Sequence, residues 1–258
     1  MSVLIDSSVK SSPRNRYHRE VHPADQIHMQ KEAAAIAAAE LLQDGMLVGL
    51  GSGSTAELTL AAIGRRVKDG LKITGIATSE KTAQLATGFN IPLATLEDFP
   101  QLDIALDGAD EIEIGSLHLI KGGGGNLLRE KLVAMVSGHF IIVADERKLS
   151  ARLASRASIP IDVVPFGWKT TAKRLEREGA QPILRLDTQG NPFVTDGGAY
   201  VLDCAFKAIP SPLELQESLN GVVGVIEHGL FLGMASEVII GGIDGVKRLT
   251  PEKDSTHP

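Results

Sequence analysis

The segment 107–111 carries residue types that suit proton transfer. It reads Asp-Gly-Ala-Asp-Glu and places three carboxylates within five residues after a short apolar run. Crowded carboxylates raise one another's pKa unless a cation lies nearby, and a raised pKa suits a carboxylate that must accept a proton near neutral pH. The segment is therefore a candidate for groups that transfer protons. Spacing alone leaves open an acidic turn in solvent.

Lys121 precedes a run of four glycines, 122–125, and Glu130 follows a few residues later. Consecutive glycines lose much conformational entropy on folding, so such a run is seldom kept for packing alone. We expect Lys121 to end a strand and point into a ligand crevice, and Glu130 to lie on the first turn of the next helix. The alternative for Glu130 is a surface residue that interacts with the helix dipole.

The segment 49–55, Gly-Leu-Gly-Ser-Gly-Ser-Thr, follows an apolar run and opens a helical pattern. Free N–H groups at a helix N-terminus, together with glycines and hydroxyl groups, favour phosphate binding, whereas the alternative is a capped tight turn. Gly51-x-Gly53-x-x-Ala56 also fits the dinucleotide fingerprint. That fingerprint needs an acidic residue about 20 positions later, and Leu71 stands there instead.

Short apolar runs alternate with helical patterns in the first part of the chain, which is typical of βαβ units and a parallel sheet. The predicted strands are 46–50, 73–77, 103–106 and 140–144, and the predicted helices are 29–42, 55–67 and 80–86. Acidic residues follow the last two strands, at the edge where open α/β sheets bind ligands. There Lys148, within Asp145-Glu146-Arg147-Lys148, could bind a phosphate, although such charge runs are usually solvated.

The pattern changes after position 149. Predicted strands at 161–164, 182–186, 193–195, 200–205 and 222–227 and predicted helices at 168–178 and 212–219 favour a ferredoxin-like β-α-β-β-α-β order. A last strand at 237–240 could return to the first sheet. The sequence thus predicts an α/β protein, a Rossmann-like, mostly parallel domain with a smaller ferredoxin-like α+β domain. The predicted ranges are a tail at 1–25, the larger domain at 26–155 and 229–250, the smaller at 156–228, and a tail at 251–258.

Composition narrows the classes of function. The chain has 258 residues and a formal net charge of −6, which argues against nonspecific binding to nucleic acid or anionic membranes. Cys204 is the single cysteine, so no internal disulfide can form and a reducing compartment is expected. The sequence shows no signal-peptide pattern and no apolar run long enough to span a membrane. The histidines lack metal-ligand spacing, so we interpret them as structural or exposed residues.

Taken in order, these segments resemble the A-type ribose-5-phosphate isomerases from about position 29 to 249. The corresponding stretches are 49–55, 107–111, 121–124 with 129–131, and 145–148. The resemblance implies a cytoplasmic, metal-independent aldose–ketose isomerase that interconverts D-ribose 5-phosphate and D-ribulose 5-phosphate through an enediolate, in the non-oxidative pentose phosphate pathway. It implies a homodimer or dimer of dimers, no cofactor, and no nucleic-acid or membrane partner.

The resemblance also implies roles for individual residues. Glu130 matches the general base, Asp107 an acid/base for the sugar oxygens, Asp110 a supporting carboxylate, and Lys121 the cation that stabilises the enediolate. The implied substrate-binding residues are Ser52, Gly53, Ser54, Thr55, Asp107, Gly108, Ala109, Asp110, Lys121, Gly122, Gly123, Gly124 and Lys148.

The chain departs from the family pattern in a few places. Ser52 replaces the usual Thr, Arg147 stands where Ser often precedes the matching lysine, and Asp162 stands for the usual Glu. The turn at 195–199 also differs. Two other functions stay open: a sugar-phosphate sensor, which needs no base, and a nicotinamide-dependent oxidoreductase, which the Gly51–Gly53 pattern suggests.

Overall fold

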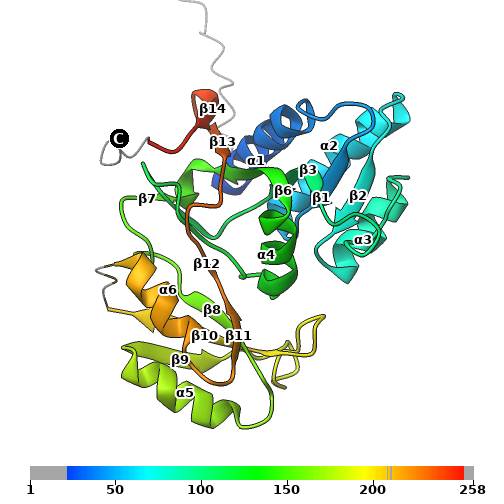
Figure 1. The fold of residues 1–258 in the computed structure, drawn as a ribbon. Helices are drawn as coiled ribbons and strands as arrows, with labels where there is room; N and C mark the ends of the chain where they lie inside the picture. The colour runs from blue at the N-terminus through cyan, green and yellow to red at the C-terminus, as the bar shows by residue number, and fades with distance from the viewer. Residues whose placement is uncertain (1–21, 208, 210, 253–258) are drawn as a thin grey trace, which may run out of the picture.

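The computed structural model describes residues 22–252 except 208 and 210, and these residues form three sheets (Figure 1). The largest sheet has six strands in the order β14-β13-β6-β3-β1-β2. Its strands are β1 (Leu47–Leu50), β2 (Thr74–Ala77), β3 (Leu102–Asp107), β6 (Ser137–Asp145), β13 (Glu237–Gly242) and β14 (Gly245–Leu249). All neighbours pair in parallel except β13 and β14. The Rossmann-like, mostly parallel sheet is confirmed, and the strand at 237–240 does return to it beside β6.

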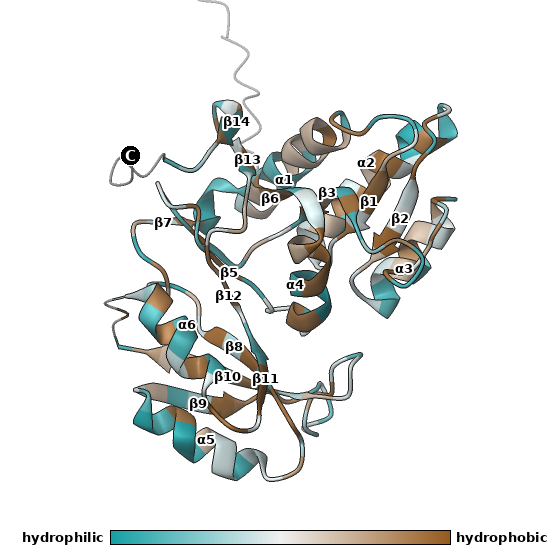
Figure 2. Ribbon diagram, in the orientation of Figure 1, coloured by the Kyte–Doolittle hydropathy of each residue, from teal (hydrophilic) through white to brown (hydrophobic). Residues whose placement is uncertain are grey.

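Helices cover both faces of this sheet, so its central strands are buried on both sides, whereas the edge strand β14 is mostly exposed. Helices α1 (Pro23–Ala39) and α2 (Ser54–Lys68) pack on one face, α4 (Leu127–Met135) packs on the other, and α3 (Glu80–Gly88) contacts β2 and α2. Along β6, Ile141 and Val143 join the core under α1 and α2, whereas Phe140 and Ile142 join the core under α4. This alternation follows the period of two in a strand. In Figure 2, β1 is apolar along its length.

The first helix begins earlier than the sequence predicted. It starts at Pro23, a residue favoured at the first helical position, and the His22 side chain accepts a hydrogen bond from Ala24 N at 3.3 Å. The prediction of a tail up to position 25 was therefore wrong for residues 23–25. Positions 1–21 and 253–258 of the predicted tails lie outside the described residues.

A second sheet has the order β11-β8-β10-β9, with every neighbouring pair antiparallel. Its elements in chain order are β8 (Ile159–Val163), α5 (Trp168–Arg177), β9 (Ala180–Leu184), β10 (Tyr200–Phe206), α6 (Pro212–Asn220) and β11 (Val225–His228). This confirms the ferredoxin-like β-α-β-β-α-β arrangement. The strand predicted at 193–195 was wrong. Only isolated bridges, Leu186 with Pro192 and Val194 with Tyr200, form there, because the connection turns back at Asp187 and again at Thr195.

Four very short strands make the third sheet, in the order β12-β5-β4-β7. They are β4 (Glu111–Glu113), β5 (Leu119–Ile120), β7 (Leu149–Ser150) and β12 (Leu230–Phe231). Each of β4, β7 and β12 closely follows a strand of a larger sheet, so this small sheet ties the two larger ones together. The six-stranded sheet takes its strands from 47–145 and 237–249 and the ferredoxin-like sheet from 159–228. The division into domains at the predicted bounds stays a prediction.

No helix within the described part of the chain is long and apolar enough to span a membrane.

Candidate active site

A cleft at the carboxyl ends of β1 and β3 brings the predicted site residues together. It is lined by Lys31, Ser52, Gly53, Ser54, Thr55, Gly108, Ala109, Asp110, Lys121, Gly122, Gly123, Gly124, Glu130 and Lys148. Every predicted binding residue except Asp107 is in this lining, and Asp107 ion-pairs with Lys121 directly beneath it. The segments that the sequence placed at separate strand ends therefore converge, as expected for this edge of an α/β sheet.

Lys121 lies between two buried carboxylates. Its Nζ is 2.9 Å from Asp107 Oδ2 and 3.1 Å from Glu130 Oε2, and it donates a hydrogen bond to Gly108 O at 2.7 Å. All three ionisable side chains are at most 4 % exposed. Burial alone would lower the pKa of Lys121, but Asp107 and Glu130 outweigh it and raise that pKa well above its usual range. Lys121 therefore stays positively charged at neutral pH.

Glu130 is placed on the first turn of α4, where its backbone N–H donates to Asn126 O at 2.9 Å. Its Oε2 is buried and has no hydrogen-bond partner among the described residues, because the approach of Lys121 meets an ion-pair distance but not hydrogen-bond geometry. Burial raises the pKa of Glu130 to about 8; Lys121 opposes this rise, and Asp107 and Asp110 add to it. Such a carboxylate accepts a proton readily near neutral pH.

Asp107 joins the end of β3 to the loop after β1. Its Oδ1 accepts hydrogen bonds from Ser52 N at 3.1 Å and Gly108 N at 2.7 Å, which leaves Oδ2 facing Lys121. A Cβ atom on Gly51 would lie 2.2 Å from Asp107 Oδ1, so only glycine fits at this close approach. Burial raises the pKa of Asp107, and Lys121 and the two N–H donors oppose that rise.

The other two carboxylates of the 107–111 segment have different surroundings. Asp110 lines the cleft, and its Oδ2 accepts a hydrogen bond from Gly123 N at 2.7 Å, which ties it to the glycine loop. Glu111 is 1 % exposed and accepts hydrogen bonds from Ser155 and Ala157, so it holds the neighbouring loop rather than a ligand. Asp110 is therefore available to a ligand in the cleft, whereas Glu111 has a structural role.

The loop before α2 offers donors to an anion. Gly53 occupies the N-cap position with φ +94°, and no side chain caps the helix there, so the first N–H groups of α2 remain available. Ser54 Oγ accepts a hydrogen bond from Lys31 Nζ at 3.0 Å. The hydroxyl of Ser52 also contacts neighbouring threonines, because its Oγ lies 2.6 Å from Thr78 Oγ1 and 3.3 Å from Thr82 Oγ1.

Lys31 was missed by the sequence reasoning. It lies on the alanine-rich helix α1, and no local motif relates position 31 to the loop at 52–55; a lone lysine on an apolar helix was the only signal. Burial lowers its pKa, and Asp145 opposes that effect. Lys148, on the short helix Glu146–Lys148, lines the same cleft, whereas Arg147 forms an ion pair with Asp145 at 2.6 Å. Two lysines and a helix N-terminus thus make this end of the cleft suitable for a phosphate group.

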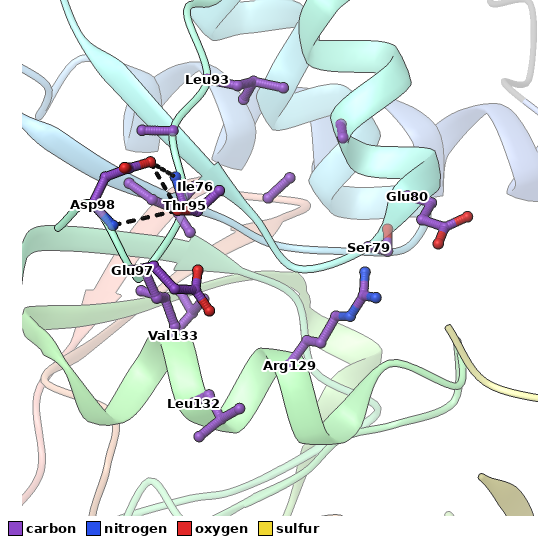
Figure 3. Close-up of a pocket in the computed structure, with 14 residues that line it drawn as sticks. Ile76, Ser79, Glu80, Leu93, Thr95, Glu97, Asp98, Arg129, Leu132 and Val133 are labelled. Carbon is purple, nitrogen blue, oxygen red and sulfur yellow. Dashed lines mark hydrogen bonds between the residues drawn. The ribbon is translucent and has the colours of Figure 1, made fainter. Parts of the chain in front are cut away.

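A larger depression of about 680 Å³ is lined by residues of β2, α3, the segment 93–98 and α4 (Figure 3). Its floor is apolar, with Ile76, Leu93 and Val133, and Arg129 is the only cation among the described residues that line it. Three carboxylates line it, those of Glu80, Glu97 and Asp98, and Asp98 accepts hydrogen bonds from Thr95, which lower the pKa of Asp98. With no buried acid–base pair, this depression lacks the means for proton transfer that the Lys121 cleft has.

The described residues offer little support for a metal centre or for dinucleotide binding. Among the described residues, no group of three or more His, Cys, Asp or Glu side chains is arranged to hold a metal ion. For a dinucleotide, β2 ends at Ala77 and is followed by Thr78 and Ser79, so no carboxylate stands at the strand end where a ribose would need one.

Comparison with known proteins identifies close relatives. A family model described as ribose 5-phosphate isomerase A (phosphoriboisomerase A) matches residues 74–245. The chain is 54% identical over 220 residues to ribose-5-phosphate isomerase A of Synechococcus sp. (strain JA-3-3Ab), covering 85% of this chain and 96% of the relative. It is 49% identical over 219 residues to the protein of the same name from Thermomicrobium roseum, covering 85% and 92%.

Solved structures agree with these relatives. The ribose 5-phosphate isomerase A of Methanocaldococcus jannaschii superimposes with a TM-score of 0.83 at 37% identity, over 86% of this chain and 99% of the other. A D-ribose-5-phosphate isomerase in complex with phospho-erythronic acid gives a TM-score of 0.84 at 37% identity, over 87% and 99%.

Proposed function

The chain belongs to the ribose-5-phosphate isomerase A family, and on that premise we propose that it interconverts D-ribose 5-phosphate and D-ribulose 5-phosphate in the non-oxidative pentose phosphate pathway. The observation that carries this proposal is the buried Lys121, which lies between the carboxylates of Asp107 and Glu130 beside an anion-binding cleft. This set of groups suits removal of a proton next to a carbonyl, where an oxyanion must be stabilised.

The phosphate group of the substrate binds at the N-terminus of α2. The free N–H groups after Gly53, the hydroxyls of Ser54 and Thr55, and the ammonium groups of Lys31 and Lys148 supply donors there. Phosphate oxygens accept such charge-assisted hydrogen bonds strongly. A similar isomerase was solved with phospho-erythronic acid, a phosphorylated sugar acid, which supports a ligand of this class.

The sugar then extends toward Glu130 for the proton transfers. Glu130 removes the proton from C2 of the open-chain aldose, the electron pair forms the C1–C2 double bond of the enediolate, and the charge collects on O1. Lys121 stabilises that oxyanion through its ammonium group. Glu130 returns the proton to C1, while the proton of the O2 hydroxyl moves to O1 with Asp107 as the exchanging group. No atom or electron is gained or lost overall, as an isomerisation requires.

Asp110 supports this chemistry without taking part in a bond change. Its negative charge helps to raise the pKa of Glu130, and its hydrogen bond to Gly123 shapes the cleft. We also propose that the reaction needs no metal or cofactor, since Lys121 supplies the positive charge at the developing oxyanion. A cytoplasmic location and assembly as a homodimer or dimer of dimers follow from the family resemblance and belong to the same proposal.

The test is ketose formation from ribose 5-phosphate with a chelator present, for the unaltered protein, Glu130→Gln and a control, Glu176→Gln. Glu176 is exposed on α5 in the ferredoxin-like unit. We expect rapid turnover by the unaltered protein and the control, and a loss of at least about a hundredfold for Glu130→Gln, the range for a general base. A folded protein that binds the sugar phosphate without converting it would refute the isomerase and favour a sensor.

A further inference from the structure

The glycine loop 122–125 poses a physical problem, because four consecutive glycines have little conformational preference of their own. Gly122 and Gly125 adopt φ values of +99° and +79°, and Gly122, Gly123 and Gly124 all line the cleft. Inside the loop, Gly125 N donates to Gly122 O at 3.0 Å. Holding this loop in one shape before substrate arrives requires contacts from outside it.

Arg185 provides such contacts from the ferredoxin-like unit. It directly follows β9, and its Nη1 donates hydrogen bonds to Gly122 O at 3.0 Å and to Gly123 O at 3.1 Å. On its other side, Nε donates to Asp203 Oδ2 at 2.9 Å and Nη2 pairs with Asp203 Oδ1. The Arg185 side chain is only 16 % exposed, and its planar guanidinium group joins the strand β10 to two carbonyl groups of the loop.

Phe193 covers the far end of the loop. A Cβ atom on Gly125 would lie 2.4 Å from Phe193 Cε1, so the ring lies directly against the glycine backbone. The guanidinium carbon of Arg185 is 5.9 Å from the centre of the Phe193 ring, and Phe193 N donates to Arg185 O at 2.9 Å. Arg185 and Phe193 thus form one rigid unit on the loop.

The loop is also fixed from the catalytic side. Asp110 Oδ2 accepts a hydrogen bond from Gly123 N, so the peptide groups around Gly123 are bonded on both sides, by Asp110 and by Arg185. Lys121, by contrast, is placed without Arg185. Its N–H donates to Gly229 O at 2.9 Å and its Nζ donates to Gly108 O. Glu130 is carried by α4.

We propose that Arg185 is a positioning residue that holds the glycine loop in its substrate-binding shape. Because Lys121 and Glu130 are placed by other elements, loss of Arg185 weakens substrate binding while the rate of proton transfer from bound substrate stays close to normal. A preformed loop lowers the ordering cost of binding, which is why the effect falls on affinity. This inference rests on the proposed isomerase function and gives the ferredoxin-like unit a direct part in it.

A role limited to stability is the competing explanation, since Arg185 also pairs with Asp203 inside the ferredoxin-like sheet. The two explanations differ in what they predict for KM and kcat. Under the positioning role KM rises alone, whereas a purely structural role lowers the unfolding temperature and leaves both constants of the folded enzyme unchanged.

The experiment compares Arg185→Met and Arg185→Lys with a control, Arg177→Met, at an exposed arginine on α5. We expect Arg185→Met to raise KM, and the inhibition constant of phospho-erythronic acid, about tenfold or more, with kcat within about threefold, because charge-assisted hydrogen bonds are lost. Arg185→Lys should recover only part of this loss, since one ammonium group cannot serve Asp203 and both carbonyls. The control should match the unaltered enzyme. An unchanged KM in a folded Arg185→Met protein, or a fall in kcat at constant KM, would overturn the proposal.

A second measurement does not depend on turnover. Hydrogen–deuterium exchange of the amides in 122–125 should be faster in Arg185→Met than in the unaltered protein, while α5 keeps its protection. If Arg185→Met does not fold, Asp203→Asn takes its place. That variant keeps Arg185 but loosens its support, and it should raise KM by about two- to fivefold with faster loop exchange. Equal exchange rates in the loop would refute the positioning role even if the isomerase assay itself had failed.

Discussion

Lys121 and Lys131 are two buried lysines whose ammonium groups both lie near the ring of Phe231, and the two lysines have different functions. Their Nζ atoms lie 5.6 Å and 4.9 Å from the centre of the Phe231 ring. Lys121 ends the strand before the glycine loop, and Lys131 follows the proposed base Glu130 on α4. Residue type, burial and one aromatic neighbour are shared, so the remaining surroundings must set the function of each.

Acceptors within the protein satisfy the ammonium group of Lys131. Its Nζ donates to Glu227 Oε1 at 2.6 Å and to His228 O at 2.7 Å, and lies 3.4 Å from His228 Nδ1. Burial lowers the pKa of His228 to about 4, so the imidazole is neutral at physiological pH. Burial also lowers the pKa of Lys131, and Glu227 opposes this. This ion pair docks α4 onto β11 and leaves nothing for a ligand.

Around Lys121, by contrast, one polar atom has no hydrogen-bond partner. It faces two carboxylates, and Glu130 Oε2 has no hydrogen-bond partner among the described residues. The cleft opens beside this group, so a substrate oxygen can take a place near the ammonium group. The difference teaches that a buried lysine becomes chemically useful where a neighbouring acceptor is left unsatisfied and accessible, and structural where every donor is already matched.

The largest expected effect separates the two lysines by activity. Lys121→Met should lower kcat by about a hundredfold to a thousandfold, the scale for removing one oxyanion-stabilising donor. Lys131→Met should lower kcat by less than about tenfold, because Lys131 acts only through the position of α4. The measurement is steady-state ketose formation, with thermal unfolding of each variant followed to confirm that the assayed protein is folded. Equal losses of kcat in the two folded variants would end the distinction.

The next effect concerns pH. In the free enzyme kcat/KM should rise with pH up to about 8, since Glu130 has a raised pKa and must lose its proton to act as the base. Asp110→Asn removes a negative charge that helps to raise this pKa. The rising limb of the plot of kcat/KM against pH should therefore move to lower pH. Glu227→Gln, at the Lys131 cluster, is the matched control and should leave the limb in place. A limb that does not move in Asp110→Asn would contradict the assignment of Glu130.

The smallest effect tests the shared ring. Phe231→Leu removes the aromatic face near both ammonium groups, and we expect the free energy of unfolding to fall by about 1–3 kcal/mol with kcat within about threefold. Denaturant unfolding and the isomerase assay together measure both quantities. If kcat fell far more than stability, the ring would serve Lys121 in catalysis, and the two lysines would differ in this respect as well.

Much of the fold follows from local patterns. The parallel strands are apolar runs bounded by loops, and their order in the chain with intervening helices is enough to predict an α/β sheet. Asp107 could be predicted because it ends a buried strand, and Lys121 and Glu130 could be predicted because they lie on the two sides of the glycine run 122–125. The strand at 193–195 could not be judged locally, since its pairing depends on where the turns at Asp187 and Thr195 direct the chain.

Features that depend on distant pairing escaped prediction. The strands β7 and β12 have two residues each, too short for any periodic signal, and they are defined only by their partners. Lys31 reaches Ser54 from another helix, and Lys131 meets Glu227 from nearly a hundred positions away. Such contacts arise from tertiary packing, and the types of the neighbouring residues in the chain do not encode them.

The place of β13 has a consequence for how the protein is made. This strand pairs in parallel with β6, yet the whole ferredoxin-like unit lies between them in the chain. During synthesis, the edge of β6 that faces away from β3 remains unpaired until β13, which ends at Gly242, has left the ribosome. Residues 140–144 of β6 are apolar and buried in the finished fold. The ferredoxin-like unit has all its strands within 159–228 and can fold first, whereas the six-stranded sheet cannot be completed before β13 and β14 are available. Such an interval favours chaperone contact with the β6 edge and slow completion of the native state.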